Sequence, residues 1–287
     1  MDTSDLAKRM KGYEERNRYY LQRRMPVILR LDMRAGHSFT KGFERPFDEV
    51  FIKSMQETAK YLCENIQGCK LSYQQSDEIT LVLVDYDKLN TDCFFNYRVD
   101  KLCSIAASMV TMVFNESFSK IYSKLYRDKI EHRENVDELV KTYAFKAGKA
   151  MFDCRCFNIP KEEVTNLIYW RQLDASRNSI QMVGQANFSH KELQNKSCND
   201  IQDMLMTQKG INWNDLPTYQ KRGSCCIKEE YAVNDNGEEV EVDCVTDVDE
   251  PVESVAFRSR WIIDTNIPIF RNEGREYIDR LVFVDEG

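Results

Sequence analysis

The chain has 287 residues, of which 42% are hydrophobic and 30% are charged, and this length accommodates one large domain or two small ones. No apolar run approaches the ~20 residues of a membrane span, and the first residues lack the apolar core of a signal peptide, so we expect a cytoplasmic protein with no membrane partner. The ten cysteines contain no C-x-x-C pair and there are three histidines, so we expect reduced thiols and no zinc site.

The net charge of −7 by itself argues against a nucleic-acid-binding protein. The acidity is local, however, because residues 228–253 hold eleven Asp or Glu and one Lys, and the remainder holds 39 basic and 36 acidic residues. We interpret the acidic segment 228–254 as a solvated hairpin or an insertion, with a wall that repels phosphate as the alternative. The rest of the chain can therefore carry a basic surface.

The first predicted element is a charged helix over residues 5–24, in which Tyr13, Tyr19 and Tyr20 lie among Arg and Lys. Aromatic and basic side chains together permit contact with nucleic acid. A surface helix that packs its tyrosines inward explains the same pattern, and the sequence leaves both interpretations open.

An apolar strand over residues 26–32 comes next and ends in the carboxylate of Asp32. Residues 33–40 then form a turn of mostly small side chains. Asp48 has the character of an N-cap, and the apolar residues after it recur at helical spacing until Gly68. We therefore expect a helix with one buried face.

Two strands, over residues 69–73 and 79–84, would place Asp77 and Glu78 on the turn that connects them. Two acids at the tip of a hairpin are ordinary on a solvated surface. They can form a metal site if a third acid converges on them, and Asp32 is the candidate, since Mg²⁺ prefers carboxylate oxygens and phosphates. The spacing alone does not decide between the two interpretations.

A second long helix is predicted over residues 92–118, and a very polar stretch over residues 120–149 leads to a strand over residues 150–157. The basic excess of the polar stretch would suit a grip on RNA, and a solvated pair of helices explains it equally well. The order strand, helix, strand, strand, helix, strand is that of an α+β, ferredoxin-like βαββαβ fold. In that topology Asp32 and Asp77 can converge, which favours the metal site.

The second half is less regular. Residues 161–170 and 185–209 have helical character, residues 210–223 are predicted to form a loop, and the last sixty residues mix short strands with the acidic segment. Pro160 is the softest break in the chain.

Common catalytic motifs are missing from the sequence: it has no Walker A loop, no G-x-G-x-x-G, no H-E-x-x-H and no G-x-S-x-G. A Cys-His nucleophile stays open, although nothing distinguishes one cysteine from the others. What remains is a cluster of carboxylates on a ferredoxin-like sheet with Mg²⁺ and a phosphate-bearing substrate. Two metals held about 4 Å apart are the usual basis of polymerase chemistry.

Six short segments resemble, in order and spacing, the tRNA-histidine guanylyltransferase superfamily: residues 30–40, 46–48, 75–78, 101–104, 152–155 and 170–174. The resemblance extends over about residues 10–225. Members of this family resemble polymerases in their palm domain and add nucleotides to the 5′ end of tRNA, in the 3′-to-5′ direction. The resemblance thus implies a polymerase palm with additional C-terminal helices and small strands.

The resemblance also implies the site residues. Asp32 and Asp77 would hold two Mg²⁺ ions, with the carbonyl of Met33 as a further ligand and Glu78 in support. The backbone that cradles a nucleoside triphosphate would be that of Met33, Arg34, Ala35, Gly36 and His37, where small residues ease a tight turn. The second triphosphate, the ATP or GTP that activates the RNA 5′ end, would be handled by Arg45, Ser76 and Lys101.

Two departures from the family pattern separate branches within it. Members that add the extra G to tRNA-histidine carry Gly at the position of Met33 and a His-Ile-Asn-Asn run where this chain has residues 176–179. The local run from Asp174 to Ile180 is more similar to the bacterial-type guanylyltransferase-like proteins, a branch associated with template-directed repair of 5′-truncated tRNAs. Asn178 would keep a polar contact to RNA or nucleotide, or would simply cap a turn.

We therefore predict a template-dependent 3′-to-5′ polymerase that repairs tRNA 5′ ends, with a catalytic palm over residues 1–158 and an RNA-binding accessory region over residues 159–287. The alternatives are a tRNA-histidine guanylyltransferase that adds one G, and a catalytically silent module that binds nucleotide or RNA. The expected partners are tRNA, nucleoside triphosphates and further copies of the chain, since family members are usually tetramers.

Overall fold

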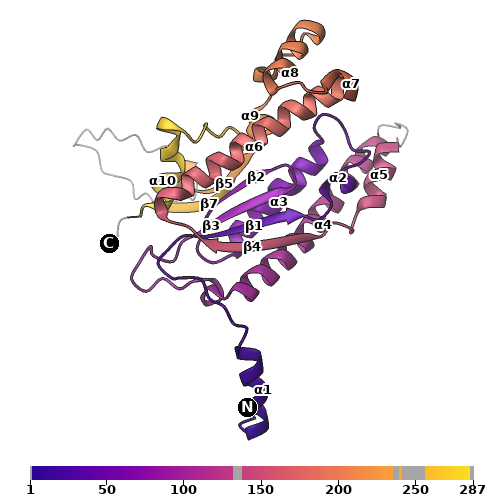
Figure 1. The fold of residues 1–287 in the computed structure, drawn as a ribbon. Helices are drawn as coiled ribbons and strands as arrows, with labels where there is room; N and C mark the ends of the chain where they lie inside the picture. Colours follow the sequence, from indigo (N-terminus) through magenta and orange to yellow (C-terminus); the bar gives the residue numbers. More distant parts are fainter. Residues whose placement is uncertain (1, 132–137, 235–238, 241–255, 285–287) are drawn as a thin grey trace, which may run out of the picture.

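The computed structural model describes residues 2–131, 138–234, 239–240 and 256–284 (Figure 1). Its centre is an antiparallel sheet in which the strands stand in the order β4-β1-β3-β2. This is the strand order of the predicted ferredoxin-like fold, and the prediction is confirmed. The four strands are β1 (Val27–Met33), β2 (Cys69–Gln75), β3 (Glu78–Leu83) and β4 (Phe152–Asn158).

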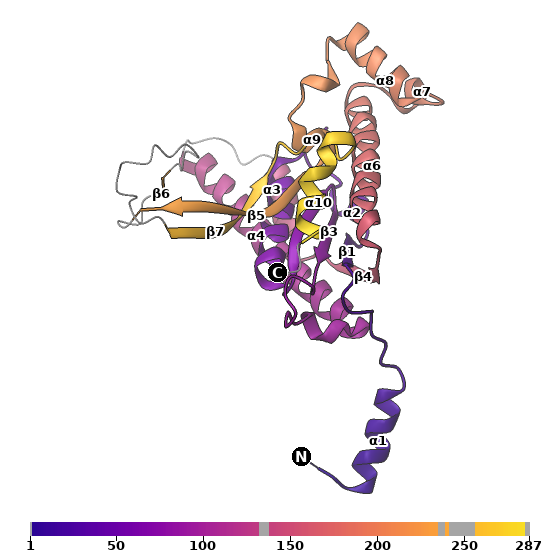
Figure 2. The same cartoon turned by 90° about the vertical axis from the view of Figure 1, so that its left-hand side faces the viewer.

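The sheet continues beyond the four-stranded core. Strand β5 (Ser224–Val233) pairs with β2, so the second half of the chain adds to the sheet that the first half begins. Strands β6 (Glu239–Val240) and β7 (Ala256–Asp264) both pair with β5. Together they form a ribbon that extends away from the body of the molecule (Figure 2).

One face of the sheet is covered by two long helices, α3 (Glu49–Asn65) and α4 (Val99–Glu131), as the fold class predicted. Alternate residues of β1, Val27, Leu29 and Leu31, are fully buried against them, because successive side chains of a strand point to opposite faces. Helix α3 begins where the carboxylate of Asp48 accepts the backbone N–H of Phe51 at 2.8 Å, which confirms the predicted N-cap.

The opposite face is covered by α6 (Lys161–Asn187) and α10 (Glu276–Val282), which lie side by side on the sheet (Figure 1). Here the alternate residues Ile28, Leu71 and Val82 pack with Ile168 and Ile278, all of them buried. The sheet is therefore buried on both faces, and charged groups on this second face must find partners there.

Helix α6 is much longer than the helix predicted over residues 161–170, since it continues to Asn187. Its distal half leaves the sheet and packs against α7 (His190–Leu193) and α8 (Cys198–Met204) through a separate small apolar cluster that contains Val183 and Leu205. The distal half of α6, α7 and α8 form a small lobe with a polar surface. Because polar residues interrupt the apolar spacing in this part of the sequence, the predicted helix is too short.

Two other boundaries differ from the predictions. The second long helix occupies residues 99–131 rather than 92–118, because η1 (Phe94–Tyr97) precedes it and the helix includes the first part of the polar stretch predicted over residues 120–149. That stretch also contains α5 (Glu138–Lys146). The predicted loop over residues 210–223 contains η3 (Trp213–Asp215) and α9 (Thr218–Arg222). Of the acidic segment, residues 228–233 belong to β5, and residues 241–254 lie outside the described part of the chain. The remaining short elements are α2 (Gly36–Phe39), η2 (Leu205–Lys209) and η4 (Asn272–Arg275).

Helix α1 (Asp5–Glu15) projects from the body of the protein and buries none of its residues (Figures 1 and 2). Tyr13, Tyr19 and Tyr20 are 56%, 68% and 53% exposed, so the interpretation that they pack inward is wrong for the single chain. In the described residues, none of the helices combines the length and the apolar character needed to cross a membrane.

Candidate active site

Asp32 and Asp77 come together at one end of the sheet, as the sequence predicted. Asp32 stands opposite Glu78 in the register of β1 and β3, and the backbone N–H of Met33 donates to the carbonyl of Asp77 at 3.1 Å. Burial raises the pKa of Asp32, and the negative charges of Asp77, Glu78 and Asp153 raise it further. The end of β1 is therefore a concentration of negative charge.

Glu78 does not lie on the turn, contrary to the prediction, because it is the first residue of β3 and only 5% exposed. Its carboxylate accepts two hydrogen bonds from Arg171 of α6, at 2.7 and 3.0 Å, and one from Arg30 of β1 at 3.1 Å. A buried carboxylate needs such partners, and two arginines supply them. Glu78 thus ties the sheet to α6, which fits the supporting role that the family resemblance gave it.

The turn after β1 comes very close to Asp77. A Cβ atom on Gly36 would lie 1.8 Å from the Oδ2 atom of Asp77, so only glycine lets that carboxylate rest on the backbone of α2. Ala35, at the start of this turn, has φ of 55°, in the left-handed region. The small residues predicted for this turn therefore have a steric reason.

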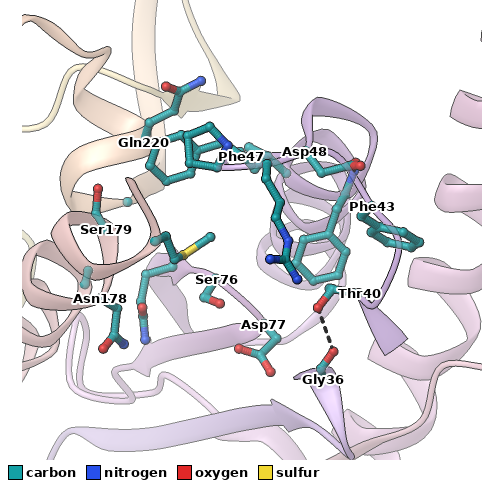
Figure 3. Close-up of a pocket in the computed structure, with 18 of the residues that line it drawn as sticks. Gly36, Thr40, Phe43, Phe47, Asp48, Ser76, Asp77, Asn178, Ser179 and Gln220 are labelled. Carbon is teal, nitrogen blue, oxygen red and sulfur yellow. Dashed lines mark hydrogen bonds between the residues drawn. The ribbon is translucent and has the colours of Figure 1, made fainter. Parts of the chain in front are cut away.

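A cavity of about 620 Å³ opens beside Asp77, between α2, α3, α6 and α9 (Figure 3). Asn178 and Ser179 reach it from α6 on one side, and Phe47 and Asp48 border it on the other. Its volume is typical of sites for nucleotide-sized ligands. Six predicted site residues line it: Gly36, His37, Arg45, Ser76, Asp77 and Asn178.

The contribution of α9 to this cavity is not among the features predicted from the sequence. Tyr219 and Gln220 line it and are both held by the carboxylate of Glu49, at 2.9 and 3.0 Å. Gly223 ends α9 with φ of +85°, and a Cβ there would lie 2.4 Å from the carbonyl oxygen of Gln74. The sequence signal was the Lys-Arg-Gly run that ends this segment, but nothing local shows that it docks on β2.

The other six predicted site residues lie outside the cavity lining: Asp32, Glu78, Met33, Arg34, Ala35 and Lys101. The side chain of Met33 is buried in the core, so only its backbone can face the carboxylates, while Arg34 and Ala35 are exposed next to it. Lys101, near the start of α4, is also exposed and does not line the cavity. Their proposed contacts with nucleotide stay predictions.

The position of Lys101 follows from the register of neighbouring elements. The Sγ atom of Cys103, on α4, lies 3.5 Å from that of Cys156, on β4. Cys156 pairs with Leu29, which lies on β1 away from Asp32. Later residues of α4 contact the end of β4 that lies beside Asp32. Lys101, near the start of α4, therefore lies toward the opposite end of the sheet. In the single chain, Lys101 is therefore remote from the predicted triphosphate.

Asp153 is a further acid at this site to which the sequence assigned no role. It stands opposite Asp32 in the register of β1 and β4, and its side chain is 65% exposed. Arg155 lies 3.9 Å from it, too far for a hydrogen bond. Because Asp32 and Asp153 pair across neighbouring strands, their like charges repel each other, and the charge of Arg155 offsets this repulsion only in part.

The oxygen atoms here fit Mg²⁺ in part. Within the described residues, no three His, Cys, Asp or Glu side chains are arranged as a complete metal site, and neither Asp32 nor Asp77 forms a salt bridge. Two unpaired carboxylates and the nearby backbone are the protein share that Mg²⁺ takes when waters and substrate phosphates supply the rest. A site with so few protein ligands suits a metal ion that binds together with its nucleotide.

Comparison with known proteins agrees with this geometry. Residues 7–160 match the family model described as Thg1: tRNAHis guanylyltransferase. Uncharacterized protein R259 of Acanthamoeba polyphaga mimivirus is 30% identical over 80% of this chain and 79% of its own length. The tRNA(His) guanylyltransferase of Kluyveromyces lactis is 26% identical over 78% of this chain and 88% of its own length.

Among solved structures, a bacterial tRNA(His) guanylyltransferase (Thg1)-like protein in complex with ATP is 40% identical and has a TM-score of 0.76. The match covers 98% of this chain and 100% of that one. The sequence and the structure lead to the same conclusion: this chain belongs to the tRNAHis guanylyltransferase (Thg1) family, a family of nucleotidyltransferases.

Proposed function

We propose that this protein is a template-dependent 3′-to-5′ polymerase that repairs the 5′ ends of truncated tRNAs. The observation that carries the proposal is the cavity beside Asp77 in a chain that aligns over 98% of its length with a bacterial Thg1-like protein bound to ATP. A related structure of the same kind contains GTP, at 38% identity and a TM-score of 0.72. Both nucleotides are therefore expected substrates.

In the proposed reaction the RNA 5′-monophosphate attacks the α-phosphate of ATP or GTP and releases pyrophosphate. The 3′-hydroxyl of the next nucleotide then attacks the activated 5′ phosphate and releases the nucleoside monophosphate. Arg45 and Ser76, which line the cavity, would hold the triphosphate, and Asn178 would orient the nucleotide from α6. Both steps depend chiefly on alignment and on neutralisation of charge.

The metal ligands in this proposal are Asp32, Asp77 and the carbonyl of Met33, which would hold two Mg²⁺ ions. When bound, Mg²⁺ would lower the pKa of the attacking hydroxyl and neutralise charge on the phosphates. Glu78 would not bind the metal directly, because Arg171 and Arg30 already occupy its oxygens. Its role would be to fix the strand next to Asp32.

Addition of a single G to tRNA-histidine is the second candidate, favoured by the names of the yeast relatives. Against it stand residues 176–179, which are Ser-Arg-Asn-Ser where the family resemblance implies His-Ile-Asn-Asn in such enzymes. A catalytically silent module is disfavoured, because the family is one of nucleotidyltransferases.

The test is an assay of end-labelled tRNA that lacks its first nucleotide, with ATP, all four NTPs and Mg²⁺. Repair predicts extension by the nucleotide complementary to the opposite strand, with a changed template base changing the product. A single G added to intact tRNA-histidine alone would establish the second candidate. Asp77→Asn should abolish either product, while Asp5→Asn on the exposed helix α1 should leave it unchanged.

We further propose a cytoplasmic homotetramer. The nine described cysteines that are free thiols support a reducing compartment. An assembly is supported by α1, which exposes Leu6, Met10 and Tyr13 and is too short to be stable as an isolated helix. Light scattering on the purified protein would measure the number of subunits, and a monomer at all concentrations would refute the assembly.

A further inference from the structure

The cavity beside Asp77 is called the nucleotide cavity from here on. A second hollow, of about 500 Å³, adjoins it at the distal end of α6. The two hollows share Arg45 and Gln185 in their walls. The second one is bounded by α7 and by the segment that leads into α8, and we call it the distal groove. A ligand that extends out of the nucleotide cavity past Arg45 therefore enters the distal groove.

The lining of the distal groove is rich in cationic and amide groups. None of its nine lining residues, all of which lie in the described part of the chain, is acidic, although the chain as a whole has 47 acids and 40 bases. The polar residues of the lining are the cations Arg45 and Lys196, the imidazole-bearing His190 and the amides Gln181, Gln185 and Gln194. Cations and amides together suit a ligand that carries phosphates and hydrogen-bonding bases.

Two acids of the same lobe are engaged elsewhere. Glu192 accepts the hydroxyl of Ser189 at 2.6 Å at the start of α7, and Asp200 accepts that of Ser197 at 2.8 Å at the start of α8. Each carboxylate also accepts the backbone N–H of the same serine, which completes a capping box, and the hydroxyl and backbone hydrogen bonds together lower the pKa of both carboxyl groups. Both carboxylates thus cap helices and do not line the groove.

We propose that the distal groove binds one or two single-stranded ribonucleotides of the RNA end that lies next to the reacting 5′ phosphate. This inference rests on the proposed function, because it assumes an RNA end in the nucleotide cavity. Phe188, the only Phe, Tyr or Trp in the lining, is 8% exposed and lies under Lys209, with a ring-to-Nζ distance of 5.3 Å. Phe188 is therefore not available for stacking, and recognition would come chiefly from phosphate contacts and amide hydrogen bonds, with His190 and Arg45 as the groups on which a base could stack.

The ligand has two possible sources, the 3′ tail of the acceptor stem or the 5′ strand itself. We distinguish them with three RNA hairpins, one with a 3′ overhang of four nucleotides, one with a 5′ overhang of the same length and one with a blunt end. The variant is the full-length protein with Gln194→Ala and Lys196→Ala combined. The matched control is Lys191→Ala, an exposed lysine of α7 that does not line the groove.

The double variant should weaken binding of one overhang hairpin by about 5- to 20-fold and reduce the salt dependence of that binding by about 0.7 in the log–log slope, the value for one lost phosphate contact on a single strand. Loss with the 3′ overhang identifies the tail, and loss with the 5′ overhang identifies the 5′ strand. Equal loss on all three hairpins, or affinities equal to those of Lys191→Ala, would overturn the proposal.

Two further measurements on the same proteins, ATP binding by calorimetry and tRNA extension, separate this inference from the proposed function. The double variant should bind ATP as the unaltered protein does, because neither residue lines the nucleotide cavity. If the unaltered protein extends no tRNA but the variant still loses overhang binding, the groove is correct and the polymerase proposal is wrong. If extension is normal and overhang binding is unchanged, the reverse holds.

Discussion

The guanidinium of Arg171, on α6, donates two hydrogen bonds, of 2.7 and 3.0 Å, to the carboxylate of Glu78, on β3. The two residues are 93 positions apart in the sequence. Both side chains are more than nine-tenths buried. Arg171 also contacts Asp174 at 3.1 Å, and its guanidinium lies 4.8 Å from the ring centre of Trp170. This cluster fixes α6, and with it one wall of the nucleotide cavity, to the strand next to Asp32.

Arg171→Ala should lower the free energy of unfolding by about 3 kcal/mol, since loss of one partner of a buried pair costs about 3–5 kcal/mol and Arg30 remains beside Glu78. Urea denaturation measures the effect. Arg177→Ala is the matched control, because Arg177 pairs with Asp174 on the same helix but is 60% exposed, so its loss should cost less than about 1 kcal/mol. Equal effects of the two changes would mean that the Glu78 cluster does not hold α6.

Gly36→Ala should reduce nucleotidyl transfer strongly while leaving the fold in place. The added Cβ would meet the carboxylate of Asp77 at 1.8 Å, and this flexible side chain can move aside where backbone could not. A displacement of about 1 Å at a reacting centre can cost about 100-fold in rate. Single-turnover extension of truncated tRNA measures the loss, and circular dichroism reports the fold.

Gly12→Ala serves as the control for that change. No atom lies within 4 Å of a Cβ placed on Gly12, and alanine in a helix is more favourable than glycine. Activity should therefore be unchanged. Full activity of Gly36→Ala would show that Asp77 does not need its present position.

Removal of divalent metal should abolish extension without unfolding the chain. Asp32 and Asp77 do not hold the core together, and their uncompensated charge is better tolerated in a folded protein when a cation is present. Dialysis against EDTA should therefore stop the reaction, leave the far-ultraviolet spectrum unchanged and slightly lower the melting temperature. Extension that continues in EDTA would contradict the metal site, and restored activity with Mg²⁺ would confirm it.

The sequence predicted the part of the fold that local patterns determine. The strand and helix order follows from apolar periods, and the convergence of Asp32 and Asp77 follows from that order. It could not predict the true length of α6 or the docking of α9, because both depend on contacts with distant segments. Nor could it show that the carboxylate of Glu78 is hydrogen-bonded by two arginines, since the charge of a residue does not reveal its partner.

Cys156 gives a prediction of chemical reactivity with a defined pH dependence. Burial and the neighbouring Cys103, with its Sγ atom at 3.5 Å, together raise the pKa of Cys156 to about 12. A raised pKa means that the thiol stays protonated at pH 8, and only the thiolate reacts with iodoacetamide. Alkylation of Cys156 in the folded protein should therefore be slow at pH 8 and accelerate steadily as the pH rises toward 11. In urea the same residue should react as an ordinary cysteine, with a midpoint near pH 8.5. Peptide mass spectrometry of a time course would measure both rates, and rapid modification of the folded protein at pH 8 would show that β4 and α4 do not enclose this thiol.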